Sequence, residues 1–327
     1  MSTPLFTLAE LDAAADLVHR SVSPTPSYEW PLLSAALSAD VVVKHENHTP
    51  VGAFKMRGGL VYVDHLRRER PEVTRIVSAT RGNHGQSLAF AGRAADLAVT
   101  IVVPRGNSAD KNAAMRALGA DVVEHGDDFQ AAREHAAHLA EADPGVELVP
   151  SFHRELVLGV ATYAYELFAQ VRDLEAVYVP VGMGSGICAL MAVRDLLGLP
   201  TEVVGVVSRR ADATARSFEA GQVVPTESAD TFVDGVATRV PDAEAIARIV
   251  AGAARIVRVG EDDAAEAMRL VFRTTHNVAE PAGSLAAAGL AADADRIRGR
   301  RVAMVLSGGN VDAPVLAAVL GGDTPRS

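Results

Sequence analysis

Apolar residues along this chain follow two patterns that alternate through most of the sequence. Short runs of branched apolar residues predict buried strands, because successive β-branched side chains disfavour a helix. The strands are predicted at residues 40–46, 75–79, 99–103, 121–124, 176–181, 202–207 and 301–306. Apolar residues spaced three and four positions apart predict helices. The helices are predicted at residues 7–21, 57–69, 88–95, 108–118, 129–142, 156–171, 187–197, 211–220, 264–275 and 282–292, and the run at 32–37 fits either type.

Strands that alternate with helices predict a parallel sheet with helical crossovers, and therefore an α/β fold. In open α/β sheets, ligands bind beyond the carboxyl ends of the strands. Four polar or glycine-containing loops lie at such ends or lead from them, at residues 49–59, 80–87, 182–186 and 307–312. We therefore expect these loops to meet at one site.

The loop at residues 49–59 carries a lysine among small and apolar residues. Phe54 precedes Lys55, and a pair of glycines follows Arg57. Burial in apolar surroundings lowers the pKa of a lysine, because the charged form loses its hydration. The neutral amine can then condense with an aldehyde or act as a base. Lys55 is therefore a candidate catalytic residue, and the alternative is a solvated lysine at the start of a helix.

Two further loops are typical of anion binding. Residues 80–87 join a predicted strand to a helix, so their amides and side chains lie where a helix N-terminus favours negative charge. The glycines of residues 182–186 allow the backbone to approach a phosphate. This glycine loop lacks the Gly-Lys-Ser/Thr ending of nucleotide loops and the full dinucleotide spacing. On its own it indicates either a phosphate site or a tight turn.

Composition narrows the class of protein. The chain has 327 residues, enough for two domains, with 49% hydrophobic and 22% charged residues. A net charge of -10 argues against a nucleic-acid partner. Cys188 is the single cysteine, so no intramolecular disulfide is possible, and it is expected to be a small buried apolar residue. With no signal-peptide pattern and no run of about 18 apolar residues, we predict a cytoplasmic protein without membrane contact.

Four motifs, in this order and at these separations, resemble those of the fold type II pyridoxal-phosphate enzymes. The resemblance is to the branch of threonine/serine dehydratases and serine racemases, and it extends from about Thr7 to Asp312. The motifs are Phe54-Lys55-Met56-Arg57-Gly58, Gly82-Asn83-His84-Gly85-Gln86, Gly182-Met183-Gly184-Ser185-Gly186 and Ser307-Gly308-Gly309-Asn310.

The resemblance implies two open, twisted, mostly parallel sheet domains with the cofactor in the cleft between them. The large cofactor-binding domain would be discontinuous, with residues 1–65 and 152–327, and the small domain would be residues 66–151. A homodimer or larger homo-oligomer is expected. No regulatory domain is expected after Asp312, because the chain ends soon after it.

The cofactor implied is pyridoxal 5'-phosphate. By the resemblance, Lys55 would bind its aldehyde covalently and take the α-proton of the substrate. The other residues expected at the cofactor are Phe54 beside the ring, Asn83 on the phenolic oxygen, Ser307 at the pyridine nitrogen, the amides of Gly182, Met183, Gly184, Ser185 and Gly186 at the phosphate, and Glu280 nearby. A hydroxyl at position 307, in place of a carboxylate, weakens the cofactor as an electron sink and favours loss of a β-substituent.

The resemblance implies a dehydratase (ammonia-lyase) that removes water from a β-hydroxy-α-amino acid of the threonine or serine type, giving a 2-oxo acid and ammonia. The substrate-binding residues expected are Thr80, Gly82 and His84 at the carboxylate, with Arg81 and Asp234 beside them. Arg81 stands where racemases of this branch have a serine that transfers protons. Because arginine is too basic for that role, a racemase is disfavoured.

Several alternatives stay open. Arg81 either pairs with a substrate carboxylate or extends into solvent. Ala53 stands where the family usually has a serine, which permits a larger side chain, so phenylserine and 3-hydroxyaspartate remain alternative substrates. No metal is predicted, because Arg209 and Arg210 follow the strand at 202–207, where the family usually has an acidic residue. A non-catalytic cofactor-binding protein and a nicotinamide-dependent dehydrogenase are the competing classes.

Overall fold

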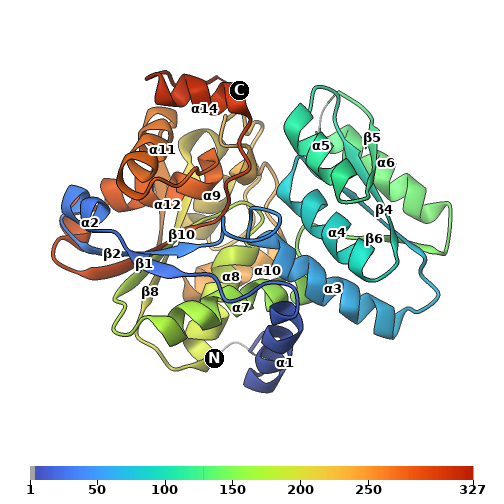
Figure 1. The fold of residues 1–327 in the computed structure, drawn as a ribbon, viewed down its shortest axis with the longest axis horizontal. Coiled ribbons are helices and arrows are strands. Elements are labelled where there is room, and N and C mark those ends of the chain that lie inside the picture. The colour runs from blue at the N-terminus through green and yellow to red at the C-terminus, as the bar shows by residue number, and fades with distance from the viewer. Residues whose placement is uncertain (1–3, 128, 327) are drawn as a thin grey trace.

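The computed structural model describes residues 4–127 and 129–326, which form two open sheets with helices packed on them (Figure 1). The larger sheet has six strands in the order β1-β2-β10-β7-β8-β9, and the smaller has four in the order β5-β4-β3-β6. Neighbouring strands are parallel except for the antiparallel pair β1 and β2. The predicted α/β class with mostly parallel sheets is confirmed.

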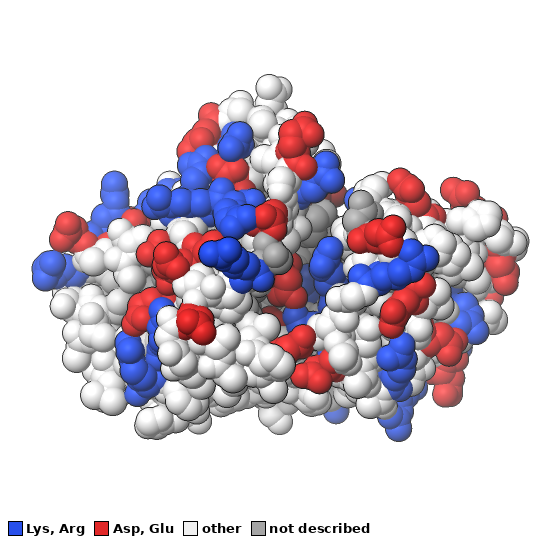
Figure 2. Space-filling view, turned by 90° about the horizontal axis from the view of Figure 1, so that it is seen from above, with Lys and Arg blue, Asp and Glu red and all other residues white. Residues whose placement is uncertain are grey.

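The strands of the larger sheet are β1 (Ser27–Glu29), β2 (Asp40–His45), β7 (Ala176–Pro180), β8 (Glu202–Ser208), β9 (Arg255–Val259) and β10 (Arg301–Leu306). Those of the smaller sheet are β3 (Arg75–Ala79), β4 (Ala98–Val103), β5 (Asp121–Glu124) and β6 (Val146–Leu148). We call each sheet with its helices the larger and the smaller unit. Seen from above, the surface is indented between the two units (Figure 2).

The helices follow the strands in the alternation that the sequence predicts. Helices in the first half are α1 (Leu8–His19), α2 (Pro31–Leu37), α3 (Lys55–Glu69), α4 (Asn83–Ala94), α5 (Ala109–Ala117), α6 (Phe129–Glu141) and α7 (Arg154–Gln170). Those in the second half are α8 (Ser185–Leu196), α9 (Ala213–Ala220), α10 (Ala243–Gly252), α11 (Glu261–Thr275), α12 (Pro281–Ala292), α13 (Ala294–Ile297) and α14 (Ala313–Leu320), with 3-10 turns η1 (Arg209–Ala211) and η2 (Asp234–Val236). Among the described residues, none of the helices is long and apolar enough to span a bilayer.

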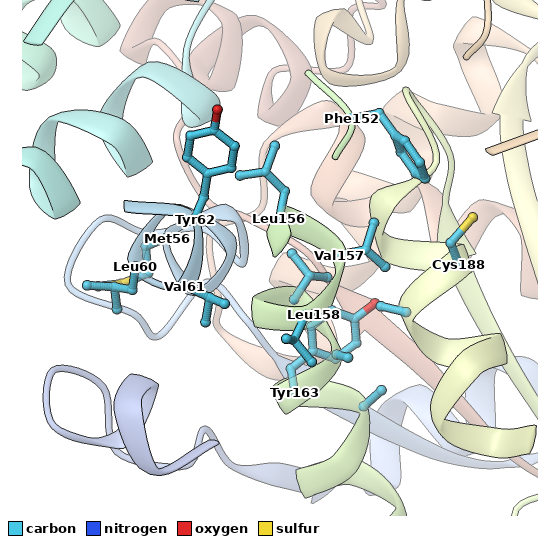
Figure 3. Close-up of a cluster of buried hydrophobic side chains, with 14 of the residues drawn as sticks. Met56, Leu60, Val61, Tyr62, Phe152, Leu156, Val157, Leu158, Tyr163 and Cys188 are labelled. Atoms are coloured by element: carbon cyan, nitrogen blue, oxygen red, sulfur yellow. The ribbon is translucent and has the colours of Figure 1, made fainter. Parts of the chain in front are cut away.

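Helix α3 lies between the two units and packs on both, against α4 on one side and α7 on the other. Figure 3 shows part of this contact, with Met56 and Leu60 of α3 and Leu156 and Val157 of α7 among the buried side chains. All four strands of the smaller sheet fall inside the predicted small domain. The exact domain boundaries stay a prediction, because α3 is shared.

Several helices begin earlier than the apolar pattern predicts, and three of them begin in the loops of the candidate site. Helix α3 begins at Lys55, α4 at Asn83 and α8 at Ser185, because the polar and glycine residues of the preceding loops form the first helical turn. The first turns therefore contain candidate site residues. The apolar run at 32–37 is helical and begins with Pro31, a residue favoured in a first turn.

Candidate active site

The loop that leads to Lys55 is fixed to the end of strand β10. The amide of Phe54 donates a hydrogen bond to the Ser307 carbonyl at 3.0 Å, and Ala53 forms an antiparallel bridge with Gly308. The hydroxyl of Thr49 bonds both the amide and the carbonyl of Ala53 at 2.9 Å. These bonds place Lys55, the first residue of α3, beside the carboxyl end of β10.

Lys55 has the environment of a reactive amine. Its side chain is only partly exposed at the start of α3. Burial lowers its pKa below the usual value for lysine, although the carboxylate of Glu280 opposes this shift. A lysine with a lowered pKa supplies the neutral amine that condensation with an aldehyde requires.

Two residues after Lys55, Arg57 belongs to a group of four buried charged side chains. We call this group the Arg57 network, and its members are Lys44, Glu46, Arg57 and Glu166. The Arg57 guanidinium donates to Glu46 at 2.7 Å and 3.0 Å and to Glu166 at 2.6 Å and 3.0 Å. The ammonium of Lys44 donates to Glu166 at 2.7 Å. Burial would raise the pKa of Glu166, but its two cationic partners outweigh burial and hold it at about 2. The network fixes the first turn of α3 to β2 and α7.

The glycine loop at residues 182–186 lies beside Phe54. The hydroxyl of Tyr163 donates to the Gly186 carbonyl at 3.1 Å, and the Tyr163 and Phe54 rings meet edge to face at 6.1 Å. A Cβ on Gly182 would lie 2.7 Å from the Gly235 carbonyl oxygen, and Gly184 has a φ of 98°. Only glycine fits these two positions, which bring the first turn of α8 close to the ring of Phe54.

The second predicted loop delivers Asn83 to the same site. The Asn83 side-chain amide donates to Glu280 Oε1 at 2.6 Å, and its oxygen accepts from Asn310 at 2.9 Å. The hydroxyl of Thr80 accepts from the Gly82 amide at 3.1 Å and so shapes the turn. The loops after β3 and β10 and the segment between α11 and α12 therefore meet at Asn83.

His84 lies buried behind this loop as a neutral imidazole. Burial, and then the charge of Lys55, lower its pKa to about 3, while a bond to the Pro150 carbonyl opposes the shift. Its Nε2 atom is buried and has no hydrogen-bond partner in the described chain. Because Nδ1 donates to Pro150, Nε2 is an acceptor, which suits a hydroxyl donor better than a carboxylate.

Glu280 is the central carboxyl group of the site. It is 2% exposed and lies between Asn83 and the Gly308 backbone. Burial raises its pKa to about 7; Asp234 adds to this, and Lys111, Asn83 and Lys55 oppose it. Glu280 therefore holds or releases a proton near neutral pH.

This pKa predicts how stability depends on pH. The unfolded chain loses the Glu280 proton near the ordinary glutamate pKa of 4.5 and the folded chain near 7, so the folded protein holds more protons between these pH values and its stability falls as pH rises. In the wild type, this proton makes the free energy of unfolding fall by about 3 kcal/mol as the pH rises through this range. We expect Glu280→Gln to abolish that part of the pH dependence. Urea unfolding at pH 5 and pH 8 measures it, and equal pH dependence in both proteins would contradict it.

The remaining predicted residues lie less centrally. The Asp234 carboxylate is paired with Lys111 of α5, and Arg81 is exposed. The sulfur of Met183 accepts from the Thr238 hydroxyl at 3.8 Å. In the described ranges, no three His, Cys, Asp or Glu side chains form a group able to hold a metal.

Two residues at or next to the site, Lys111 and Tyr163, were not predicted from the sequence, and Arg57 and Asn310 lay in the quoted motifs without an assigned role. One signal pointed to Lys111. Of the 31 lysines and arginines, only three are lysines, namely Lys44, Lys55 and Lys111.

The arrangement fits a cofactor that carries both an aldehyde and a phosphate. Lys55 offers a neutral amine for the aldehyde. The glycine loop at residues 182–186 offers free amides at a helix N-terminus, where a phosphate is favoured. Ser307 is 4% exposed at the end of β10, with a hydroxyl able to meet a ring nitrogen.

Comparison with known proteins agrees with this fit. Threonine dehydratase of Nicotiana attenuata is 31% identical over 313 residues, which cover 95% of this chain and 52% of that protein. The chain thus spans about half the length of that relative. L-threo-3-hydroxyaspartate ammonia-lyase of Saccharomyces cerevisiae is 28% identical, and the match covers 94% of each chain.

Solved structures share the fold. The processed form of threonine deaminase isoform 2 from Solanum lycopersicum superposes with a TM-score of 0.88 at 28% identity, over 99% of both chains. A sequence model of the pyridoxal-phosphate dependent enzymes matches residues 18–308. The predicted family, fold type and cofactor are confirmed, and the chain belongs to the family of pyridoxal-phosphate dependent enzymes.

Proposed function

We propose that this protein is a dehydratase that removes water from a β-hydroxy-α-amino acid and releases a 2-oxo acid and ammonia. The observation that carries the proposal is the group formed by Lys55, Asn83 and Glu280 beside Ser307. It combines an amine of lowered pKa with a carboxyl group that titrates near neutral pH. The names of the relatives support the same reaction class.

The chain's own residues supply the proton transfers and the binding contacts. Bound pyridoxal phosphate would withdraw electrons from the α-carbon of the substrate. Lys55, as a neutral amine, would take the α-proton, and Phe54 would support the cofactor ring. The hydroxyl of Ser307 would be a weak partner for a positively charged ring nitrogen, and this would favour loss of the β-hydroxyl.

The leaving hydroxyl needs a proton and a hydrogen-bond partner. Glu280 can hold a proton near neutral pH, because burial raises its pKa to about 7. His84 Nε2 is a buried acceptor in the loop of residues 80–84. We infer that this loop receives the polar groups of the substrate, with its amides toward the carboxylate.

Threonine or serine is the proposed substrate, and one observation favours a second candidate. Arg81 is exposed in the loop of residues 80–84 and forms no ion pair with any described residue. A free guanidinium suits a second carboxylate, such as that of 3-hydroxyaspartate. Ala53, which offers no hydroxyl, keeps phenylserine as a further alternative. A homo-oligomer and a cytoplasmic location stay predictions.

A substrate panel tests the proposal. Threonine, serine, threo-3-hydroxyaspartate and threo-phenylserine, each as both enantiomers, are followed by release of 2-oxo acid and ammonia. We expect turnover of threonine or serine, unchanged within about threefold by Arg81→Ala, since a solvated arginine contributes little. If the protein turns over 3-hydroxyaspartate and Arg81→Ala reduces this activity by about 100-fold, 3-hydroxyaspartate is the substrate instead.

Chiral analysis of the remaining substrate completes the panel. Inversion without release of ammonia would replace the dehydratase by a racemase. A cofactor-loaded protein that turns over none of these compounds contradicts the proposed reaction.

A further inference from the structure

Lys111 crosses from the smaller unit to the larger one and ends inside the site. We propose that Lys111 is a positioning residue of the proposed dehydratase: its ammonium, tied to Asp234, holds the loop of residues 80–84 over the site and faces Glu280. The inference rests on the proposed function for its kinetic part. Its electrostatic part concerns a carboxyl group that can be observed without turnover.

The first turn of α5 makes two polar contacts across the units. The Lys111 ammonium pairs with the Asp234 carboxylate in η2, which packs against α12 of the larger unit. The Ser108 hydroxyl donates to Asp312 Oδ1 at 2.5 Å and accepts from the Lys111 amide at 3.0 Å. One helix start therefore joins both units at two points.

Lys111 also touches the backbone of the substrate loop. A Cβ on Gly82 would lie 2.8 Å from the Cδ atom of Lys111, so the aliphatic stem of the lysine rests directly on this glycine. The next residue, Asn83, donates to Glu280. A shift of the Lys111 side chain is thus transmitted to Gly82 and Asn83.

The choice of lysine over arginine is informative in this chain. Arginine provides 28 of the 31 cationic side chains, and the three lysines are buried or only partly exposed. Lys55 needs an amine for chemistry. At Lys111, the ammonium is a compact donor, whereas the planar guanidinium fork of arginine is larger and would displace Gly82 or Asp234.

Charges of opposite sign face Glu280 from different elements. Lys111 approaches from α5, Lys55 from α3 and Asp234 from η2, with the neutral amide of Asn83 from α4. Lys111 lowers the pKa of Glu280, and Asp234 raises it. Removing the charge of Lys111 should therefore raise the pKa of Glu280, and removing the charge of Asp234 should lower it.

The test compares Lys111→Met and Asp234→Asn in the cofactor-loaded enzyme. The infrared band of the protonated Glu280 carboxyl, assigned by its loss in Glu280→Gln, is followed against pH. We expect the midpoint to rise above that of the wild type in Lys111→Met and to fall below it in Asp234→Asn. In both variants kcat/KM should fall about 100-fold, as expected when a binding loop is misplaced.

Arg116→Met is the matched control, because Arg116 lies on the same helix, is exposed and has its nearest carboxylate at 3.9 Å. It should change neither readout. Lys111→Arg should keep the midpoint near that of the wild type while kcat/KM stays low, because charge is retained but the fit at Gly82 is lost.

The two parts fail separately. The role of Lys111 would be overturned if the Glu280 midpoint shifted in the same direction in Lys111→Met and Asp234→Asn. It would also be overturned if the midpoint in both variants equalled that of Arg116→Met. Full kinetic recovery in Lys111→Arg would overturn the steric role. A wild-type enzyme without dehydratase activity contradicts the proposed function, yet the opposite shifts of the Glu280 titration are still observable. If Lys111→Met does not fold, the downward shift in Asp234→Asn decides the electrostatic part.

Discussion

Replacing Lys55 by alanine is expected to lower turnover of the accepted amino acid by about 10⁴-fold or more. A general base alone accounts for up to about 10⁴-fold, and this variant also loses the nucleophilic amine that would hold the cofactor. The fold should survive, because the bonds that fix the loop before α3 are made by Thr49, Ala53 and Phe54. Release of 2-oxo acid measures the loss.

Covalent attachment gives an independent readout. Borohydride reduction of the loaded wild-type protein, followed by digestion and mass spectrometry, should place the cofactor on Lys55. Only Lys44 and Lys111 compete for the assignment. Lys55→Arg serves as the matched variant, since it keeps a long basic side chain without a reactive amine. An adduct on another lysine, or more than about 1% residual activity in Lys55→Ala, would refute the role of Lys55.

Arg57→Met is expected to reduce the free energy of unfolding by about 3–5 kcal/mol, the typical cost of removing one partner from a buried ion pair. Arg57 is fully buried and provides the bonds that join Glu46 to Glu166. Without it, the two carboxylates face each other with Lys44 as the remaining buried cation of the network. Guanidinium unfolding measures the change.

The matched control lies on the same helix. Arg68 pairs with Asp64 at 3.1 Å, and both side chains are exposed. Arg68→Met should therefore change the unfolding free energy by no more than about 1 kcal/mol. A similar loss in both variants would mean that the effect comes from α3 in general and that burial of the charges is not its cause.

Strands in the interior of both sheets could be predicted from the sequence, because short uninterrupted apolar runs such as residues 302–306 are typical of strands that are buried on both faces. The strands that were missed carry weaker patterns. Strands β1 and β6 have only three residues each, and β9 contains Arg255 and Arg258, whose charged groups reach carboxylates at the surface. Propensity cannot detect a strand whose stability comes from its neighbour.

Some residues of the candidate site could also be predicted from the sequence, and others could not. Lys55, Asn83 and the loop at residues 182–186 were predictable, because short motifs mark backbone positions with special geometry. The partners of Glu280 were not. Lys111 faces Glu280 from a segment roughly 170 residues earlier in the chain, and Asn310, roughly 30 residues later, donates to Asn83, which in turn donates to Glu280. Such contacts depend on how the two units meet, which no local pattern encodes.

The core surrounding α3 has a consequence for how the protein resists unfolding. One continuous apolar cluster runs from Ile101 in β4 through Leu60 of α3 and Leu156 of α7 to Val177 in β7. The two sheets are thus separate hydrogen-bonded systems joined by this shared cluster, while each also has an apolar cluster of its own. A substitution that disrupts packing in the smaller unit is therefore expected to destabilise the larger sheet as well. The two units should then unfold together in one cooperative transition and not as independent domains.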